Sequence, residues 1–486
     1  MNQTEYLKYD GLALAALVRN KDMRASELLD MAIAQMQRVQ PSINAVCWEA
    51  LDDARTRAAA MDAAPPQGAF AGVPMLLKDI AVSVKGMVLA NGSRLFKDCV
   101  GTYDSELAVR LRNAGFNFFG RTTSPEFGAN CTTEALVYGG PTRNPWNLAL
   151  SSGGSSGGAA AAVAAGIIPL AHGSDGGGSI RIPASSCGLF GLKPTRMRNP
   201  MGPVAGEGWG GLGVEHMLTR SVRDSAAALD ATHGADPGAP YAAPRFDGSY
   251  LRAIETPPKR LRIALVTQSP SGEPVHEDCV AATESAARLC ESLGHHVTRT
   301  TLPDCNFEAF GEAMRLIVAA GTAQAVQAGS AMRGRRATLD DLEISIFTAV
   351  DLALRSSAVD YANAVGLMHR VGRQMGVFMQ DYDVILTPTL TAPPAPLGRY
   401  AADRDYVTHR SDTLRFTAFL PYFNASGQPA MSVPLHWNAQ GLPIGVQFVG
   451  GLGQEDVLLQ LAAQLETAAP WFDRLSPLAD APLSQN

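Results

Sequence analysis

Two serines and one lysine have the types and local sequences that a hydrolytic site requires. Ser155 lies within residues 153–158 (GGSSGG), and Ser179 directly follows three consecutive glycines. Lys78 ends the apolar run 73–77 (VPMLL). Acyl transfer needs a nucleophile, a base that takes its proton, and donors that stabilise the oxyanion formed when a carbonyl is attacked. The two serine loops and the lysine supply candidates for each of these parts.

Lysine is a better candidate for the base than histidine. None of the nine histidines falls in a recognisable nucleophile-base motif, and the nearest in sequence, His172, falls on a predicted strand. The run before Lys78 predicts a segment buried on both sides, and a desolvated lysine loses its proton more readily. Alone, such a lysine is more often a strand-end residue whose ammonium reaches solvent. The two serine loops favour the catalytic interpretation.

The segments around the serines predict a loop, a helix, a strand and a second loop. The alanine-rich stretch 159–165 with Gly166 after it is typical of a helix and its glycine stop, so Ser155 is expected just before a helix N-terminus. The apolar run 167–171 (IIPLA) predicts a short buried strand. Residues 173–181 then read as a second loop that carries Ser179 near its end.

The glycines before Ser179 are candidates for an oxyanion hole. Without β-carbons, the N–H groups of Gly176, Gly177 and Gly178, together with that of Ser179, are able to turn toward one point, as in a backbone anion nest. Removing one such donor typically raises a barrier by about 3–4 kcal/mol.

These motifs resemble those of the amidase signature hydrolases, which use a Ser-Ser-Lys triad. Residues 177–184 (GGSIRIPA) are similar to the nucleophile motif of that family, 153–158 to its second motif, and 76–79 (LLKD) to its lysine motif. The resemblance extends from about residue 71 to 465 and is weakest between 304 and 380. Residues 171–173 and 426–430 look most like the subgroup that cleaves nylon-oligomer amides, and like related aryl-amide and carbamate hydrolases.

The resemblance implies a role for each of these positions. Ser179 would be the acylated nucleophile, Ser155 the proton relay after a cis Gly154–Ser155 peptide bond, and Lys78 the base. Asp175 and Arg181 would pair to hold the nucleophile loop. The resemblance also implies that Asn130 and Cys131 lie beside the pocket for the acyl group. At position 176 many family members have a residue larger than glycine, so we expect a more flexible oxyanion loop here.

The expected fold is α/β, the amidase signature fold with a mixed twisted β-sheet surrounded by α-helices. We expect one domain over residues 1–486, with N-terminal helices in 1–60 packed on it. A helix is predicted after Ser26, with an apolar stripe and an end at Pro41. Residues 262–298 read as a strand-helix-strand unit, and the helical region 304–380 is expected to shape the leaving-group side of the pocket.

The expected activity is hydrolysis of an amide-type C–N bond, in a linear or cyclic amide, an aryl amide or a carbamate. One alternative is the amidase subunit of a tRNA-dependent glutamine amidotransferase, which copurifying subunits and glutaminase activity would favour. Another is a binding protein that keeps the fold without the chemistry, which failure of a serine probe to label Ser179 would favour. Two simpler interpretations of the glycine-rich loops, a flexible linker and a phosphate-binding loop, have less support. Linkers rarely abut apolar segments, and no Gly-Lys-Ser/Thr sequence follows the loops.

Composition narrows the function further. The net charge of −6 and pI near 5.9 give no general attraction to nucleic acid. Seven dispersed cysteines suggest no disulfide framework, and neither they nor the histidines have metal-ligand spacing, so we expect no metal or cofactor and a cytoplasmic location. The N-terminus lacks secretory-signal features and no run spans a bilayer. The expected partner is a small-molecule amide or carbamate, with no nucleic acid or membrane; a homodimer is left open.

Overall fold

The computed structural model describes residues 1–64 and 67–480 and has a mixed α/β architecture, as predicted. Its centre is an eight-stranded sheet in the order β10-β9-β11-β13-β12-β7-β8-β6. The strands β9, β10 and β11 pair in parallel, and the other neighbours are antiparallel. The strand bounds are β6 (Leu170–Asp175), β7 (Phe190–Lys193), β8 (Val214–Thr219), β9 (Arg262–Leu265), β10 (His296–Arg299), β11 (Val384–Pro388), β12 (Ala430–Trp437) and β13 (Pro443–Gly450).

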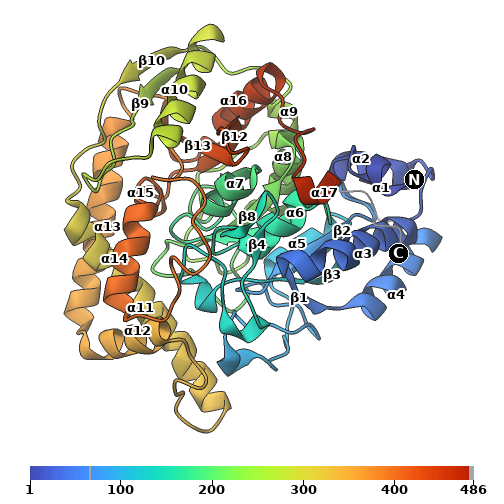
Figure 1. Cartoon of the computed structure of the whole chain (residues 1–486), viewed down its shortest axis with the longest axis horizontal. Helices are drawn as coiled ribbons and strands as arrows, with labels where there is room; N and C mark the ends of the chain where they lie inside the picture. Colours follow the sequence, from blue (N-terminus) through green and yellow to red (C-terminus); the bar gives the residue numbers. More distant parts are fainter. Residues whose placement is uncertain (65–66, 481–486) are drawn as a thin grey trace.

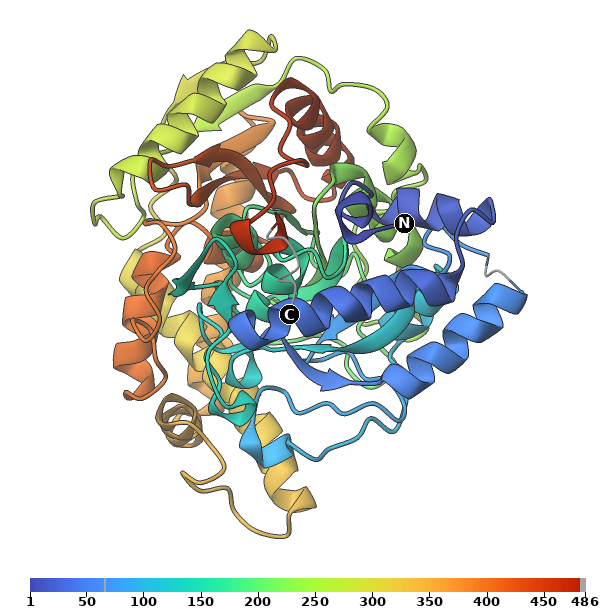
Figure 2. The same cartoon turned by 45° about the vertical axis from the view of Figure 1, so that its right-hand side comes forward.

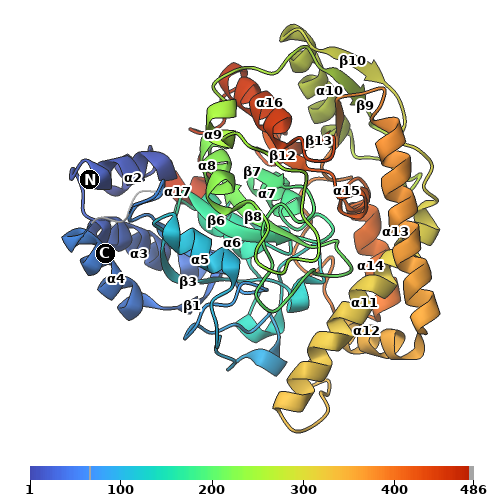
Figure 3. The same ribbon diagram turned by 180° about the vertical axis from the view of Figure 1, so that it is seen from behind.

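Helices cover both faces of this sheet because successive strand side chains point to opposite sides. On β9, Ile263 packs with one helical layer and Ala264 with the other, and on β11 Leu386 and Ile385 divide in the same way. The first layer holds α8 (Val222–Thr232), α9 (Tyr250–Ala253), α10 (Glu277–Ser292) and α16 (Glu455–Ala468). The second holds α11 (Phe307–Met332), α12 (Ile344–Arg355), α13 (Ala358–Phe378), α14 (Tyr406–Phe416) and α15 (Pro421–Ser426). In Figures 1 and 3 this second layer forms the yellow-to-orange side of the molecule.

A smaller sheet carries the lysine at the opposite, blue side of the molecule (Figure 1). It has the order β1-β3-β2, with β1 (Val46–Glu49), β2 (Pro74–Lys78) and β3 (Asn117–Thr122), and Lys78 lies in register with Thr122. Around it lie α1 (Gln3–Tyr6), α2 (Gly11–Arg19), α3 (Ala25–Ile43), α4 (Leu51–Ala63) and α5 (Glu106–Asn113). Figure 2 shows α3 lying across this side of the molecule.

The remaining elements connect these layers. A two-stranded ribbon contains β4 (Arg143–Asn144) and β5 (Asn147–Ser151), and the 3-10 helices are η1 (Arg94–Phe96), η2 (Glu126–Gly128) and η3 (Leu136–Tyr138). The helices α6 (Gly157–Ala164) and α7 (Arg181–Cys187) follow the two serine loops, and α17 (Pro477–Asp480) lies near the C-terminus.

Several predicted elements are confirmed, and two boundaries are corrected. The helix after the first serine loop, the strand that ends at Lys78 and the strand-helix-strand unit β9-α10-β10 are present. However, α3 has Arg24 rather than Ser26 at its N-cap and continues through Pro41 to Ile43, because proline in the last turn removes only one helix hydrogen bond.

The second correction concerns the strand before Ser179. The predicted strand over 167–171 instead spans Leu170–Asp175, since the Ile167 N–H still bonds the Ala162 carbonyl at the end of α6. Residues 173–175, predicted as loop, pair with β8 through Gly173 opposite His216 and Ser174 opposite Glu215. This shift places Ser174 and Asp175 on a rigid strand next to the nucleophile loop.

Candidate active site

Lys78 and Ser155 meet inside the protein. The Lys78 Nζ lies 2.6 Å from the Ser155 Oγ and 2.8 Å from the Ser174 Oγ. The Lys78 side chain is fully buried, and its backbone N–H donates to the His172 Nδ1 at 3.3 Å, which links β2 to β6. The link between β2 and β6 therefore places the amine beside Ser174 on β6, and the loop before α6 brings Ser155 to it.

Burial makes the Lys78 amine easier to deprotonate. Desolvation lowers the pKa of Lys78 to about 7, although the negative charges of Glu215 and Asp175 act in the opposite direction. Lys193 on β7 is also buried and has a pKa lowered to about 7, but its Nζ donates to the carbonyl of Pro194. Burial alone therefore does not distinguish the two lysines; the contact with the serine hydroxyls does.

Ser155 lies in a tight turn directly before α6, as predicted. Its peptide bond with Gly154 is cis. The first turn of α6 packs so closely on the residue after β3 that a β-carbon at Gly158 would lie 2.4 Å from the Thr123 Oγ1. Glycine at this position allows the helix, and with it Ser155, to approach the lysine.

Ser179 lies between β6 and α7, next to the first serine loop. The backbone N–H of Ser156 donates to the Ser179 carbonyl at 3.1 Å, which joins the two loops. Ser179 and Ser155 line one pocket, with a volume of about 140 Å³. The other residues that line it are Ile80, Ala81, Phe127, Gly128, Ser174, Asp175, Gly176, Met201, Gly208, Trp209, Gly213 and Glu215.

The loop before Ser179 differs in one respect from the expected oxyanion hole. The Gly178 N–H donates to the Asp175 Oδ1 at 2.7 Å, so this amide holds the loop instead of facing the pocket. Across residues 1–64 and 67–480, no acceptor is bonded to the N–H groups of Gly176, Gly177 or Ser179. These three amides are therefore unbonded donors in the described chain, whereas the Gly178 amide is bonded within its own loop.

Asp175 and Arg181 form the predicted pair in the protein interior. The Arg181 Nε donates to the Asp175 Oδ2 at 2.9 Å, and its Nη2 donates to the Oδ1 at 3.0 Å. Arg181 also donates to the side chains of Asn424 at 2.6 Å and Gln447 at 2.7 Å. Burial opposes ionisation of the Asp175 carboxyl, but the Arg181 charge and hydrogen bonds prevail and hold its pKa well below the usual range.

Trp209 occupies the space beside the oxyanion loop. A β-carbon at Gly176 would lie 2.7 Å from the Trp209 Cε3, and one at Gly321 on α11 would lie 2.6 Å from its Cδ1. The indole is thus packed between two glycines, one of which belongs to the helical layer. The small residue at 176 accommodates this ring, which belongs to a segment distant in sequence.

Asn130 and Cys131 lie on a second, narrower chamber next to Ser179. The Asn130 Nδ2 donates to the Tyr400 carbonyl at 2.7 Å, and its Oδ1 accepts the Cys131 N–H at 2.7 Å. Burial raises the pKa of the Cys131 thiol to about 12. In this structure the Asn130 amide organises the chamber wall, and Cys131 contributes a neutral thiol.

Sequence reasoning missed three polar residues of the site. Ser174 accepts from the Lys78 amine, and the His172 Nε2 lies 2.9 Å from the Glu215 Oε2. Because the His172 Nδ1 accepts a backbone N–H, the network assigns the ring proton to Nε2, which donates to Glu215. His172 and Ser174 are two residues apart, so on a strand both side chains lie on one face, and this spacing could have identified them. The prediction of a loop over residues 173–175 removed that signal.

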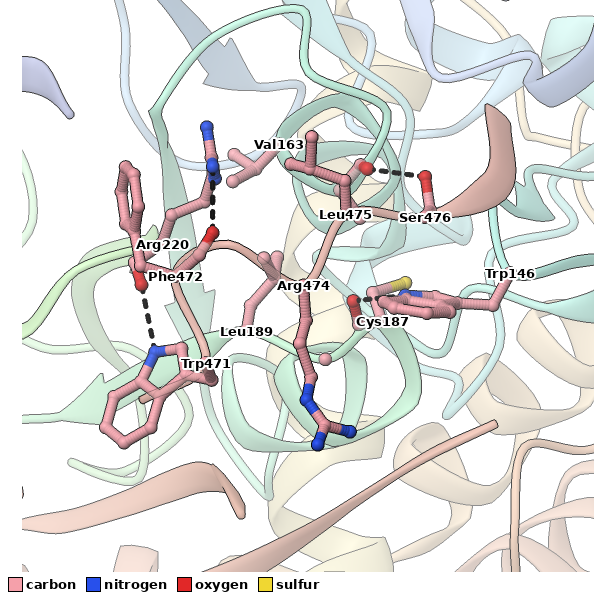
Figure 4. A pocket seen from close by; sticks show the side chains of 12 residues that line it. Trp146, Val163, Cys187, Leu189, Arg220, Trp471, Phe472, Arg474, Leu475 and Ser476 are labelled. Carbon is pink, nitrogen blue, oxygen red and sulfur yellow. Dashed lines mark hydrogen bonds between the residues drawn. The ribbon is translucent and has the colours of Figure 1, made fainter. Parts of the chain in front are cut away.

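Three further features of the described chain were compared with this site: metal-ligand clusters, long apolar helices and a small cavity beside Trp471. Within residues 1–64 and 67–480, no cluster of three or more His, Cys, Asp or Glu is arranged to hold a metal, and no helix has the length and apolar character to cross a membrane. A separate cavity of about 10 Å³ lies between α6 and the segment that includes Trp471 and Arg474 (Figure 4). There, Arg220 and Trp471 donate to the carbonyls of Phe472 and Arg220, both at 2.9 Å, so this cavity is a packing feature.

Comparison with known proteins agrees with this geometry. The model of the family described as Amidase matches residues 27–459. A 6-aminohexanoate-cyclic-dimer hydrolase from Pseudomonas sp. (strain NK87) is 38% identical over 96% of each chain. A solved 6-aminohexanoate cyclic dimer hydrolase complexed with substrate superposes with a TM-score of 0.92 at 37% identity, over 98% of this chain and 100% of the other. A bacterial aryl acylamidase of the amidase signature family superposes with a TM-score of 0.89 at 29% identity, over 98% of this chain and 99% of the other. Together with the buried lysine bonded to Ser155, these matches show that the chain belongs to the amidase family and is an enzyme that hydrolyses amide C–N bonds.

Proposed function

We propose that this enzyme hydrolyses linear or cyclic amides through an acyl-enzyme on Ser179, with aryl amides and carbamates as further substrate classes. The observation that carries the proposal is the 2.6 Å contact between the Lys78 amine and the Ser155 hydroxyl, in a pocket that Ser179 shares. With a pKa of about 7, a large fraction of Lys78 is neutral near pH 7, so the amine is able to accept a proton.

In the proposed mechanism, the three side chains act in sequence. The Ser179 Oγ bonds to the substrate carbonyl carbon while its proton passes through the Ser155 hydroxyl to the Lys78 amine. The resulting oxyanion accepts hydrogen bonds from the Gly176, Gly177 and Ser179 amides. The C–N bond then breaks, and the leaving nitrogen receives the proton from Lys78 through Ser155.

Water completes the cycle by the same route. It attacks the acyl carbon, its proton passes to Lys78, and the bond between the acid and Ser179 breaks as the proton returns to the Ser179 Oγ. Asp175 and Arg181 do not touch the substrate in this scheme. They hold the oxyanion loop, because Asp175 accepts the N–H groups of Gly178 at 2.7 Å and Ile180 at 3.2 Å.

The pocket supports a small substrate with apolar portions. Ile80, Phe127, Met201 and Trp209 supply apolar walls, whereas the polar groups gather around the serines. A volume of about 140 Å³ suits part of a small molecule rather than a folded polypeptide. The relatives named for cyclic-dimer and aryl-amide hydrolysis support the same range of substrates.

The test measures hydrolysis of a panel containing a cyclic oligoamide, a linear oligoamide, an aryl amide, a carbamate and glutamine. We expect Ser179→Ala and Ser155→Ala to lower kcat on the preferred substrate by about 10³-fold or more while the proteins remain folded. Ser292→Ala, at the exposed end of α10, is the control.

The same panel distinguishes the other functions. Retention of full hydrolysis by folded Ser179→Ala would overturn the mechanism. Turnover of glutamine alone would favour an amidotransferase subunit, and failure of a fluorophosphonate to label Ser179 in folded protein would favour a binding protein without catalysis.

A further inference from the structure

Arg410 lines the second chamber next to the nucleophile. The chamber is bounded by Ser179 and Gly177 of the oxyanion loop, by Met314 of α11 and by Arg410, Thr413 and Leu414 of α14. Ser179, Gly128 and Trp209 line both this chamber and the larger pocket. A molecule whose carbonyl reaches Ser179 therefore has this chamber within reach as well.

In the part of the chain that the structure describes, the Arg410 guanidinium has no carboxylate partner and only weak neutral ones, and one of these is the Tyr406 hydroxyl. Its buried Nε has no hydrogen-bond partner, and its Nη1 reaches the Ala129 carbonyl only at 3.4 Å. Among the residues that the structure describes, no carboxylate forms an ion pair with Arg410. A buried donor without a partner typically costs about 1–3 kcal/mol, and a charged one more.

Neighbouring arginines show that this part of the fold otherwise pairs its charges. The Nη1 of Arg404, just before α14, lies 2.9 Å from the Asp412 Oδ2, and the Nε of Arg415 on α14 lies 3.0 Å from the Glu273 Oε1. Arg410 is the arginine of this group that faces the chamber with Ser179. The lack of a carboxylate partner therefore distinguishes Arg410 from Arg404 and Arg415.

The dimensions of the chamber limit what it is able to accept. Its volume of about 20 Å³ holds one or two water-sized groups, which fits a single oxygen-bearing group and excludes an alkyl chain. The larger pocket instead carries the carboxylate of Glu215, which is bonded to His172. An acceptor group of the substrate is thus favoured at Arg410 and disfavoured beside Glu215.

We propose that Arg410 is a specificity-determining residue that binds an oxygen acceptor of the substrate other than the attacked carbonyl, either a carboxylate or a second amide carbonyl. This inference rests on the proposed amide hydrolysis at Ser179. It predicts a preference for oligoamides and for amides of diacids or amino acids, because a guanidinium forms strong charge-assisted hydrogen bonds with such oxygens.

The experiment compares four probe amides of matched length. The first is N-hexylhexanamide, and the second and third are its analogues with a terminal carboxylate on the acyl side or on the amine side. The fourth has a primary carboxamide in place of the carboxylate, at the end where the enzyme prefers the carboxylate. We expect the wild-type protein to favour at least one acceptor-bearing probe in kcat/KM. Arg410→Met should reduce that probe's kcat/KM about tenfold or more beyond any loss for N-hexylhexanamide. Arg410→Lys should recover part of the carboxylate preference, and Arg415→Met is the matched control on α14.

A binding measurement separates this inference from the proposed function. In the Ser179→Ala background, hexanoate or hexanamide should raise Tm more than 1-hexanol does, and Arg410→Met should abolish that difference. If wild-type protein cleaves no probe, the mechanism at Ser179 fails, whereas the Tm comparison still decides the role of Arg410. Equal losses on all probes in Arg410→Met, or no wild-type preference for an acceptor, would overturn the proposal.

Discussion

The Trp209 ring fills the volume that a side chain at Gly176 would require, with a projected separation of 2.7 Å between the added β-carbon and Cε3. Gly176→Ala therefore should displace the indole or the oxyanion loop. We expect a loss of about 1–3 kcal/mol in unfolding free energy, typical of overpacking, and a reduced kcat/KM. Urea unfolding and steady-state kinetics measure both.

A double-mutant cycle tests whether the ring is the cause. The cost of Gly176→Ala should be smaller in a Trp209→Ala background, because the clash is then removed. Gly140→Ala is the control, since its β-carbon would find no neighbour nearer than 3.9 Å. An equal cost in both backgrounds would show that Trp209 does not limit the size of residue 176.

The pH dependence of hydrolysis should report the Lys78 amine. Because its pKa is lowered to about 7 and the base acts in its neutral form, kcat/KM should fall on the acid side of about pH 7. The negative charge of Glu215 favours the protonated lysine. Glu215→Gln should therefore move the acid limb to lower pH, by up to about one unit. An unchanged pH midpoint, or a shift to higher pH, would contradict this assignment. Glu277→Gln, at an exposed position in the first turn of α10, is the control.

Lys78 should also make stability depend on pH. Its pKa in the folded protein lies below the value of 10.5 for a free lysine, so between about pH 7 and 10.5 the unfolded chain binds more protons than the folded one. The unfolding free energy of the wild type should therefore rise with pH in this window relative to Lys78→Met, by at most about 1.4 kcal/mol per pH unit. Denaturant unfolding of both proteins at pH 7 and pH 9 measures the difference. If the difference in unfolding free energy between the two proteins is the same at both pH values, Lys78 has an ordinary pKa.

Breaking the buried pair of Asp175 and Arg181 should be costly. Asp175→Asn leaves the fully buried guanidinium without its counter-charge, and we expect a loss of about 3–5 kcal/mol in unfolding free energy. Asp351→Asn breaks an exposed pair with Arg355 on α12 and should cost no more than about 1 kcal/mol. Similar losses in both variants, measured by urea unfolding, would argue against the structural role of the buried pair.

Much of the local structure around the site follows from residue pattern. The apolar run before Lys78 predicts β2, the alanines after Ser155 predict α6, and both elements are present. The strand before Ser179 extends beyond the apolar run that predicts it, because glycine and serine residues continue the strand and do not belong to the apolar pattern. Their β-pairing with β8 stabilises residues 173–175, and that pairing involves a partner about 40 residues away.

What the sequence determined by itself is the set of chemical groups: two serines in glycine-rich loops, a lysine after an apolar run, and an acid and an arginine on either side of the nucleophile. Tertiary structure decided which of their atoms are free to act. The Gly178 N–H donates to Asp175, and the Ser174 hydroxyl accepts from the Lys78 amine. Trp209 and Arg410, from segments distant in sequence, line the chamber beside Ser179. The physical reason is that hydrogen-bond partners, desolvation and packed volume depend on neighbours across the fold, which local residue patterns do not encode.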